Sequence, residues 1–339
     1  MRKFEVITLD QEDWDQTVFN SIDYDFYHTQ AYHKLETQGD SILLKTSVKE
    51  NFIAIPLIKK SIPNTEYFDC TSAYGYVGPI TNIDSVNNNE IVNFFNEDLK
   101  NFFNDQKIVA CFSRLHPLLK NDVLIENLGT ILPLNDIVSI DLNLTNEEQR
   151  KQYRKSNKYE INKLKKNNFY VEEATTREDI DMFIDIYTQT MNKVGASKQY
   201  YFTKDYFYRF LNNKSFTTKL LLAKHEDNIT AGAIFTVTNN IMQYHLAGTD
   251  SNFAKLTPMK LIIDEARLIG NNLNVKYLNL GGGVSGSDQD SLFKFKSGFS
   301  NINYKFKVWR YVVNESIYND LVKKSNADLN SNFFPLYRS

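Results

Sequence analysis

The segment VKYLNLGGG, residues 275–283, decides how the second half of the chain is expected to fold. VKYLNL is a short apolar run and predicts a buried strand. Three glycines follow at once, and Gly281, Gly283 and Gly286 together match the dinucleotide pattern G-x-G-x-x-G. The first question is therefore whether these glycines hold a nucleotide cofactor.

A dinucleotide site needs this pattern in the first βαβ unit, with an acidic residue about 20 positions later for the ribose. Here the pattern lies near the end of the chain, and Lys305–Lys307 occupy the region where that acid is expected. The dinucleotide interpretation therefore fails. Glycines after a strand also let backbone approach backbone or ligand closely, and they expose N–H groups to a carbonyl or phosphate oxygen.

The elements before this strand follow a regular order. Two alternating apolar runs, 219–224 and 229–238, predict a hairpin, and IMQYHLAGTD (241–250) predicts a third strand. PMKLIIDEARLI (258–269) has a helical period, with Thr257 as the expected N-cap and a proline at the first helical position. The order is hairpin, strand, helix, strand.

The first half repeats that order, offset by about 170 residues. A hairpin is expected at 42–48 and 52–58, a Gly- and Tyr-containing strand in TSAYGYVGPI (71–80), a helix at 90–104 and a buried strand at 107–115. One α+β unit used twice explains both halves. We predict two domains, 1–145 and 146–339.

Composition limits the class of protein. An apolar content of 42% is typical of a globular chain, and a net charge of −2 excludes a wholly basic nucleic-acid binder. Cys70 and Cys111 lie in unrelated contexts, which argues against a disulfide scaffold and favours a reducing compartment. Acidic residues arrive too early for a signal peptide, and no apolar run of about 18 residues is present. We expect a soluble cytoplasmic protein.

The segment RKQYRKSNKYEINKLKK, residues 150–166, holds eight basic residues and one acid, Glu160. On a continuous helix Arg150, Arg154 and Lys158 would stack at a spacing of four, with Lys155 alongside. Such a ridge could face the phosphates of a nucleotide diphosphate, a lipid pyrophosphate or an RNA backbone. It could equally be a solvated helix face, and both interpretations stay open.

Other catalytic patterns are missing from the sequence. There is no Walker A loop, no G-x-S-x-G nucleophile elbow and no HExxH or Cys/His ligand spacing, so we expect no metal site. His245, on the third strand, is expected to be a core or cleft histidine. FKFKSGF (293–299) places Lys294 and Lys296 beside aromatic residues, where a positive charge could meet a developing oxyanion or a phosphate.

Taken together, these segments resemble the Fem-type aminoacyltransferases. The resemblance lies in YHLAGTD (244–250), the helix led by Pro258, the strand ending in LNLGGG (278–283) and the closing FKSGF (295–299). The family has an aromatic before Gly-Thr, a Pro-led helix, a strand ending in Asp-Phe-Gly-Gly and a Phe-Lys-x-x-Phe-Gly segment. RKQYRKSNKYEINK, at 150–163, is similar to its basic helix.

The first half is similar through YHTQAYHKL (27–35) and SAYGYVGPI (72–80), so the resemblance extends roughly from Phe26 to Phe306. It implies an α+β fold of two tandem GNAT-like domains, each a mixed twisted sheet flanked by helices. It also implies transfer of an aminoacyl group from aminoacyl-tRNA to an amine of a peptidoglycan precursor, with the transfer site in the second domain. No tightly bound cofactor is implied.

The resemblance also implies site residues. Lys296 matches the lysine that stabilises charge at the transferring carbonyl. Further substrate-binding positions are implied on the basic segment, the third strand, the glycine loop and the loop after it: Arg154, Lys155, Lys158, Lys193, Lys198, Tyr244, His245, Gly248, Thr249, Gly282, Gly283 and Phe295. The lysines at 193 and 198 would meet the diphosphate of a UDP- or lipid-linked precursor, with peripheral membrane contact in the lipid-linked case.

Two departures bear on the substrate. Asn279-Leu280 stands where Asp-Phe is usual, and the second half shows no long helical-hairpin insertion that could grip tRNA. The alternative is an acyl-CoA-dependent N-acyltransferase acting on an amino sugar or nucleotide sugar of surface polysaccharide synthesis. Typical GNAT enzymes hold the CoA diphosphate with a glycine-rich loop before a helix, and the loop here, SNFAKLTPMK (251–260), has no glycine. A binding protein without activity is the third possibility.

Overall fold

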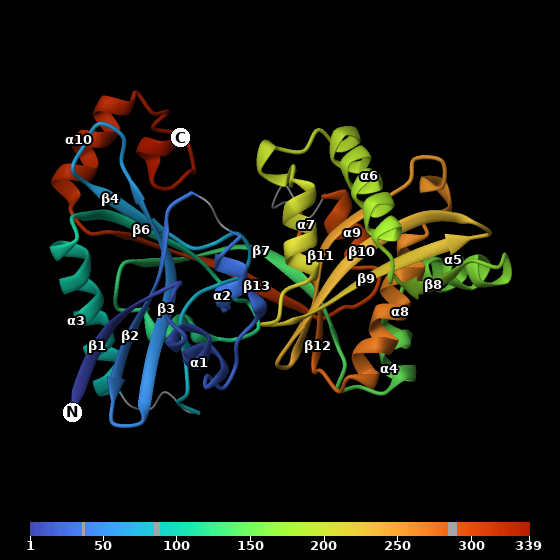
Figure 1. The fold of residues 1–339 in the computed structure, drawn as a ribbon, viewed down its shortest axis with the longest axis horizontal. Helices are drawn as coiled ribbons and strands as arrows, with labels where there is room; N and C mark the ends of the chain where they lie inside the picture. The colour runs from blue at the N-terminus through green and yellow to red at the C-terminus, as the bar shows by residue number, and fades with distance from the viewer. Residues whose placement is uncertain (36–37, 85–88, 284–289) are drawn as a thin grey trace. The chain divides into compact units, whose positions relative to one another are not determined.

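The computed structural model describes residues 1–35, 38–84, 89–283 and 290–339, and it shows mixed sheet flanked by helices (Figure 1). The chain divides into two compact units, Met1–Leu134 with Lys305–Ser339, and Asn135–Tyr304. Both boundaries fall inside strands, because β7 (Thr130–Asp141) and β13 (Asn303–Val312) each contribute residues to both units. No helix in the described part of the chain is long and apolar enough to cross a membrane.

The first unit is built on a mixed sheet. Its strands follow the order β1 (Arg2–Thr8), β2 (Asp40–Val48), β3 (Asn51–Ser61), β4 (Phe68–Thr71), β6 (Ile108–Leu115) and β13, with β5 (Ile80–Thr81) paired to β3. Its helices are α1 (Asp13–Phe19), α2 (Gln30–His33), α3 (Asn89–Asp105) and α10 (Glu315–Ser325), with short 3-10 turns at Phe26–His28, Asn121–Leu124 and Leu336–Arg338. The apolar face of α3 packs on β2, β3 and β6.

The second unit repeats the plan. Its strands follow the order β7, β12 (Tyr277–Gly281), β11 (Ile241–Thr249), β10 (Asn228–Thr238), β9 (Thr217–His225) and β8 (Tyr170–Glu173). Its helices are α4 (Asn146–Gln152), α5 (Lys155–Lys166), α6 (Arg177–Val194), α7 (Lys204–Leu211), α8 (Met259–Asn272) and α9 (Ser291–Lys296), with 3-10 turns at Lys198–Tyr200 and Ala254–Leu256.

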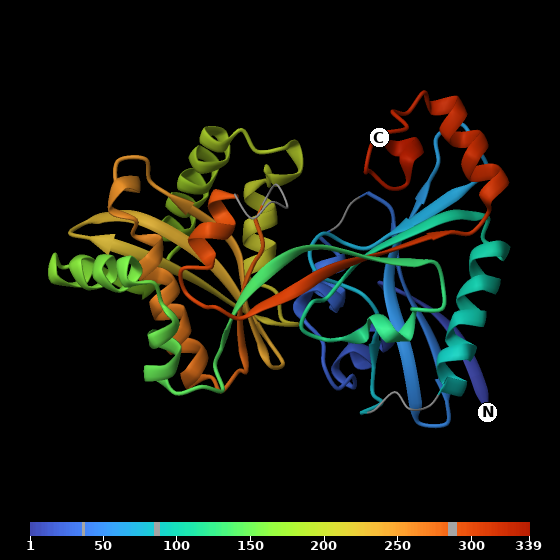
Figure 2. The ribbon, with the colours of Figure 1, turned by 180° about the vertical axis from the view of Figure 1, so that it is seen from behind.

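Helices cover both faces of this second sheet. At Gly232 of β10 an added Cβ would lie 2.5 Å from the ring of Phe183 in α6, so α6 presses on that face. Ala231 and Ala233 point the other way, into the core that includes Ile262 of α8. The helices α4, α5 and α8 lie together in both views (Figures 1 and 2). This two-sided burial explains the continuous apolar runs in the sequence.

The predicted hairpins and helices are confirmed in both halves, whereas the predicted strand at 71–80 is wrong. The two hairpins appear as β2–β3 and β9–β10, and the two helices appear as α3 and α8. TSAYGYVGPI is largely irregular, because only its first residue and its last one fall in strands. Thr257 is not an N-cap: it adopts φ +54°, and Pro258 takes the cap position.

The compact units differ from the predicted domains at the C-terminus. The prediction assigns everything after residue 145 to the second domain. Residues 307–312 of β13 instead pair antiparallel with β6, and α10 packs on the same strand, so Lys305–Ser339 belongs to the first unit. Strand pairing between segments about 200 residues apart leaves no local sign in the sequence, since it depends on tertiary contacts.

Candidate active site

The central feature of the second unit is an opening in its sheet. The strands β11 and β12 run parallel, and they pair over only three positions, the last of which joins Gln243 and Asn279. β11 then continues to Thr249 and β12 to Gly281, with no further pairing between them in the described residues. The two strands therefore separate from this point onward.

The separation is built into the strands by side chains and a bulge. Tyr244 pairs with Phe235 and Leu246 pairs with Ile234, which leaves His245 as an extra residue. Such a bulge bends its strand and disrupts the ladder locally, and bulges are frequent beside active sites. Two side-chain amides then bond the backbone where the pairing stops.

These amides belong to Gln243 and Asn279. Gln243 Nε2 donates to the carbonyl oxygen of Tyr244 at 2.8 Å, and the backbone N–H of Gly281 donates to Asn279 Oδ1 at 2.9 Å. Both side chains are buried. The two backbone groups therefore keep hydrogen-bond partners although the strands have parted, which lowers the cost of the opening.

Lys296 reaches this opening from α9. The helix starts at its N-cap Asp290, whose Oδ1 accepts from the backbone N–H groups of Leu292 at 2.8 Å and Phe293 at 3.0 Å. Lys296 is its last residue and is 7% exposed. Its Nζ donates to the carbonyl oxygen of Gly282 at 2.7 Å and lies 5.6 Å from the centroid of the Tyr244 ring.

The charge state of Lys296 is unusual for a lysine. Burial lowers the pKa of Lys296 from 10.5 to about 7, although the carboxylate of Asp290 acts in the opposite direction. Burial also raises the pKa of Tyr244 well above its usual value, so this ring stays neutral. A lysine that changes charge near neutral pH, held at a gap between two strands, is a candidate for chemistry.

The predicted neighbours on β11 divide between the two faces of the sheet. Tyr244 contacts Phe235 and the α8 core, on the side of Lys296. His245 instead stacks on Phe210 of α7, with ring centroids 4.8 Å apart, and burial lowers the pKa of His245 to about 3. His245 is therefore neutral, and its side chain packs on the face of the sheet opposite to Lys296.

Gly248 and Thr249 serve the packing of β11 on α6. An added Cβ at Gly248 would lie 2.8 Å from the Cα of Tyr187 in α6, and the backbone N–H of Thr249 donates to Thr190 Oγ1 at 3.0 Å. Both residues thus hold β11 against α6, and their role in substrate binding stays a prediction.

Gly282 and Gly283, directly after β12, are packed closely against Asn135 and Asp290. An added Cβ would lie 2.8 Å from Asn135 Nδ2 at Gly282 and 2.5 Å from Asp290 Cγ at Gly283, so larger residues would collide at both positions. Gly286 lies outside the described residues. Phe295 packs in the core against Phe299, with ring centroids 5.6 Å apart, and so anchors the turn next to Lys296.

The basic segment is not one helix. α4 ends at Gln152 and α5 begins at Lys155, while Tyr153 and Arg154 have extended backbones. The predicted stacking of Arg150, Arg154 and Lys158 on one helix face is therefore wrong. The chain turns here because Tyr153 is drawn into the core, where it is 3% exposed.

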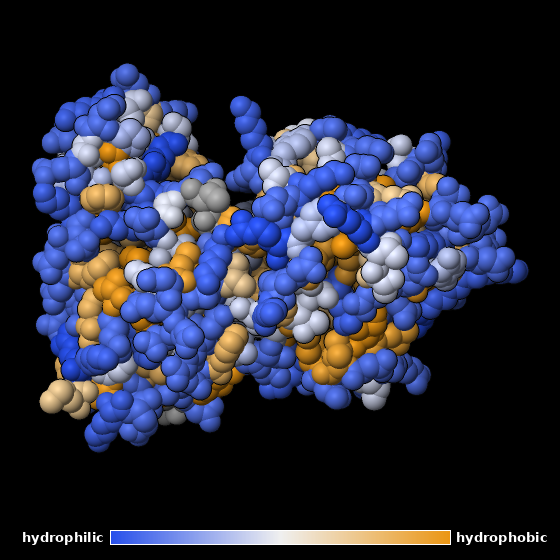
Figure 3. All heavy atoms as spheres, viewed as in Figure 1, coloured by the Kyte–Doolittle hydropathy of each residue, from blue (hydrophilic) through white to orange (hydrophobic). Residues whose placement is uncertain are grey.

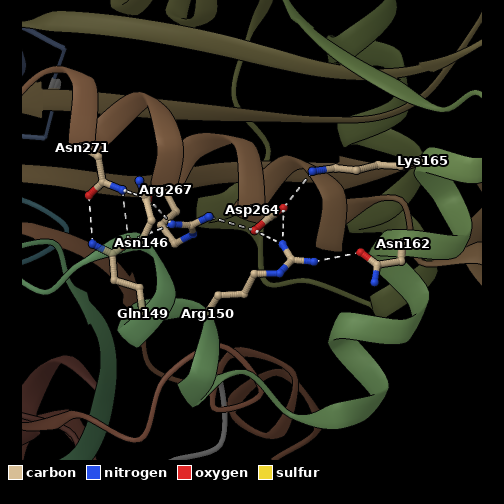
Figure 4. Close-up of polar contacts among 8 residues, drawn as sticks. All are labelled: Asn146, Gln149, Arg150, Asn162, Lys165, Asp264, Arg267 and Asn271. Carbon is tan, nitrogen blue, oxygen red and sulfur yellow. Dashed lines mark hydrogen bonds and ion pairs between the residues drawn. The ribbon is translucent and has the colours of Figure 1, made fainter.

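Several cations of this segment have internal partners. The buried carboxylate of Asp264 on α8 accepts from Arg150 Nη1 at 3.0 Å and from Lys165 Nζ at 3.1 Å, and Arg267 lies beside it (Figure 4). Lys158 Nζ donates to the carbonyl oxygen of Lys151 at 3.1 Å. These contacts join α4 and α5 to α8, so part of the basic segment is structural.

Other cations remain on the surface. The side chain of Lys155 is exposed and has no hydrogen bond or ion pair within the described residues. On the same helix Tyr159 is 68% exposed, and the α5 end of the unit is hydrophilic in the space-filling view (Figure 3). Lys193, in the last turn of α6, and Lys198, in the following 3-10 turn, are likewise exposed.

Sequence reasoning missed several residues of this site. Asp290, directly before SLFKFK, could have been recognised as an N-cap because an Asp precedes an apolar run. Gln243 and Asn279 show no such local sign, since their roles depend on which strands become neighbours. Within the described residues, no group of three or more His, Cys, Asp or Glu side chains is arranged to hold a metal ion.

Comparison with known proteins agrees with this geometry. Residues 151–296 match the family model described as an acetyltransferase (GNAT) domain. This stretch is therefore similar to acyltransferase domains of the GNAT type. Across the described residues it contains the separated strands, α8 and the helix that carries Lys296. No curated protein matches the sequence significantly.

Solved structures extend the likeness over the whole chain. A crystal structure of FemX has a TM-score of 0.74 at 13% identity, covering 94% of this chain and 99% of that one. L-PGS from Bacillus licheniformis has a TM-score of 0.60 at 15% identity, covering 91% and 94%. A tandem GNAT protein from the clavulanic acid biosynthesis pathway has a TM-score of 0.50 at 6% identity, covering 92% and 99%.

The chain has the Fem-type tandem GNAT fold. The predicted fold of two GNAT-like domains is thereby confirmed, as is the expectation of an acyltransferase. The Fem-type fold also accounts for the repeated order of elements in the two halves. The matched domain model lies in the second half, where the resemblance had placed the transfer site.

Proposed function

We propose that the protein is an N-aminoacyltransferase that moves an aminoacyl group from aminoacyl-tRNA to an amine of a peptidoglycan precursor. The observation that carries this proposal is the position of the Lys296 ammonium, bonded to the Gly282 carbonyl where β11 and β12 separate. The Fem-type fold supports the choice of acyl group. An aminoacyl ester lying in the opening would place its carbonyl within reach of a buried cation.

The reaction needs orientation and charge stabilisation more than strong acid–base groups. The neutral amine of the acceptor attacks the ester carbonyl, a C–N bond forms and a tetrahedral oxyanion develops. The C–O bond to the tRNA ribose then breaks, and the proton lost by the amine neutralises the departing ribose oxygen. In its protonated form Lys296 stabilises the oxyanion, and its fixed position avoids reorganisation during the reaction.

The surroundings of α8 favour aminoacyl-tRNA over acyl-CoA as the donor. A helix N-terminus is a natural place for a diphosphate. Here Glu160 of α5 already lies at the first turn of α8, where its Oε2 accepts from Thr257 Oγ1 at 2.8 Å and from Lys260 Nζ at 2.5 Å. A diphosphate would have to displace this carboxylate or meet its negative charge.

The exposed cations suggest where the two substrates bind. Lys155 is exposed and Lys158 is half-buried, with its Nζ bonded to the carbonyl oxygen of Lys151. Next to the exposed ring of Tyr159, these two lysines suit the phosphates and an unpaired base of tRNA. Lys193 and Lys198 suit the diphosphate of a UDP- or lipid-linked precursor, with peripheral membrane contact in the lipid-linked case. No tightly bound cofactor is part of this proposal.

The test is a donor comparison with the purified full chain. tRNA charged with radioactive amino acids, each in turn, and radioactive acetyl-CoA are incubated with a UDP-linked peptide precursor or with amino sugars. The proposal expects label to pass from tRNA to the peptide precursor, and Lys296→Met to abolish this transfer. Transfer from acetyl-CoA to an amino sugar would replace it with the sugar N-acylation alternative, and full turnover by Lys296→Met would move the chemistry elsewhere.

A further inference from the structure

Arg154 contacts the helix that carries Lys296 through three donors. Its Nη1 donates to the carbonyl oxygen of Lys294 at 2.8 Å, and its Nη2 donates to Ser297 Oγ at 2.8 Å. Its backbone N–H donates to the carbonyl oxygen of Gly298 at 2.9 Å. All three acceptors lie within two residues of Lys296. The side chain and the backbone of Arg154 therefore both contact the C-terminal end of α9.

The helix α9 needs such a partner because of its length and its ending. It has six residues, and helices this short have little stability of their own. The carbonyl oxygens of Phe293, Phe295 and Lys296 accept from the backbone N–H groups of the three residues after the helix, whereas the carbonyl oxygen of Lys294 accepts from side chains, those of Arg154 and Ser297. A cation at a helix C-terminus also complements the helix dipole. The side chain of Asp290 accepts hydrogen bonds from the first turn of α9, and the side chain of Arg154 donates to the last turn.

The burial of Lys296 makes this restraint consequential. Taking an ammonium out of water is unfavourable, so a loosened α9 would let the side chain turn toward solvent. Among the described residues Lys296 Nζ is held by its hydrogen bond to the carbonyl oxygen of Gly282, and this contact would be lost in that movement. A residue that fixes the turn around Lys296 therefore also fixes where its charge lies.

Arg154 is itself held in a rigid frame. One helical turn further along α5, Asn157 lies against Gly298, where an added Cβ would be 2.5 Å from Asn157 Nδ2. On the other side of the turn, Arg150 is bound to the buried carboxylate of Asp264. The segments before and after Arg154 are thus both packed against the rest of the unit. The hydrogen bonds of its side chain then restrain α9.

We propose that Arg154 is a positioning residue that acts through Lys296, and that it is not a phosphate ligand of either substrate. The inference rests on the proposed function only in that Lys296 takes part in the transfer. Although Arg154 is exposed, Nη1 and Nη2 of its guanidinium each bond an acceptor of the turn that carries Lys296, whereas its neighbour Lys155 has no such bond in the described residues. The two adjacent cations therefore have different tasks.

The test compares Arg154→Met, Arg154→Lys and Lys155→Met in the full chain, with Lys166→Met as a control on the exposed face of α5. The first measurement needs no substrate: the rate at which an amine reagent labels Lys296 is followed against pH by mass spectrometry. Wild type and Lys166→Met are expected to show half-maximal labelling near pH 7. Arg154→Met is expected to move this midpoint upward by at least one pH unit, because Lys296 becomes hydrated.

The second measurement separates kcat from KM in the transfer assay. Arg154→Met should lower kcat at least tenfold with little change in the KM for tRNA, and added guanidinium should restore part of the loss. The kcat of Arg154→Lys should lie between those of wild type and Arg154→Met, because a lysine can keep one of the two side-chain hydrogen bonds. Lys155→Met should raise the KM for tRNA instead.

Two results would overturn the inference. One is an unchanged labelling midpoint of Lys296 in Arg154→Met; the other is a rise in KM without a fall in kcat, which would make Arg154 a ligand. Failure of the proposed function is recognised separately: the labelling midpoint would shift in Arg154→Met although the wild-type protein transfers nothing from charged tRNA. Circular dichroism of each variant is the control for correct folding.

Discussion

Lys296 Nζ lies 2.7 Å from the carbonyl oxygen of Gly282, a residue 14 positions earlier in the chain. This contact joins the end of α9 to the end of β12, at the opening between β12 and β11. It holds a lysine in a buried place where its charge is costly. Such an arrangement is unfavourable for folding alone, and it is the strongest structural argument that this part of the GNAT domain performs chemistry.

The first prediction concerns the pH dependence of transfer. If the Lys296 ammonium stabilises the oxyanion, kcat/KM falls as pH rises through about 7, because burial has lowered the pKa of this lysine to about 7. Lys296→Arg should move that limb to much higher pH, since a guanidinium stays protonated. Initial rates from pH 5.5 to 9.5 measure this. A rise through pH 7 in wild type that is lost in Lys296→Arg would make Lys296 a general base, whereas a rise shared by both proteins reports deprotonation of the acceptor amine.

The second prediction concerns stability at the same residue. The folded pKa of Lys296 lies below its unfolded value of 10.5, so the unfolded chain binds more protons between about pH 7 and pH 10.5. The lysine therefore lowers stability as pH falls through this window. Lys296→Met should be more stable than wild type by up to about 5 kcal/mol at pH 7.

Urea unfolding at pH 7 and pH 10 measures this difference, which should shrink at the higher pH. Lys294→Met is the matched control, because Lys294 lies on the same helix but is exposed. It should change the free energy of unfolding little at either pH. Equal effects of the two variants would contradict the buried position of Lys296.

The third prediction concerns the donor. Hydrogen bonds from Lys260 and Thr257 lower the pKa of Glu160 despite its partial burial, so this residue is a carboxylate at neutral pH. CoA should not raise the Tm of wild type. Glu160→Gln should gain a measurable CoA-dependent rise in Tm while transfer from charged tRNA continues. Strong stabilisation of wild type by CoA would favour the acyl-CoA alternative.

The fourth prediction concerns the polar network around α8. Asp264 is fully buried, and the cations Lys165, Arg150 and Arg267 lower its pKa although burial opposes them. Asp264→Asn should cost about 3–5 kcal/mol at pH 7, because it leaves buried positive charge without a counter-ion. The free energy of unfolding in urea measures the loss. Asp205→Asn, at an exposed ion pair, is the control and should have little effect.

The same network has a pH signature. A carboxyl whose folded pKa is lowered stabilises the fold above its unfolded pKa of about 4, and this contribution disappears as pH falls further. The difference between wild type and Asp264→Asn should therefore shrink below pH 4. A constant difference from pH 7 to pH 2 would show that the ion pairs are not its cause.

The fifth prediction concerns Lys155, Lys158 and Tyr159 of α5. The double variant of Lys155→Met and Lys158→Met should weaken tRNA binding. It should also reduce the slope of log Kd against log salt by about one to two, because binding then neutralises fewer phosphates and releases fewer counterions. Tyr159→Ala should weaken binding with no change in slope, since stacking is uncharged. Fluorescence titration from 50 to 300 mM salt measures both. An unchanged slope in the double variant would place the tRNA elsewhere.

Local sequence determined much of the fold. Alternation in Ile42–Val48 and Lys219–Lys224, and the helical period in Glu90–Asn104 and Pro258–Ile269, each appear as the expected element. These patterns are local because a strand or helix buries one face at a fixed residue period. The repeated order of the elements then identified two similar units. Close packing at Gly282 and Gly283 likewise agrees with the close approach that local sequence suggested.

Only the tertiary structure decided which lysine became buried and which cations stayed exposed. Lys294 and Lys296 stand in equivalent sequence surroundings, yet one points to solvent and the other into the opening of the sheet. Arg154 bonds a carbonyl 140 residues away, and Arg150 bonds a carboxylate 114 residues away. No local pattern encodes such partners, because their positions depend on how the strands pair and how the helices pack on them.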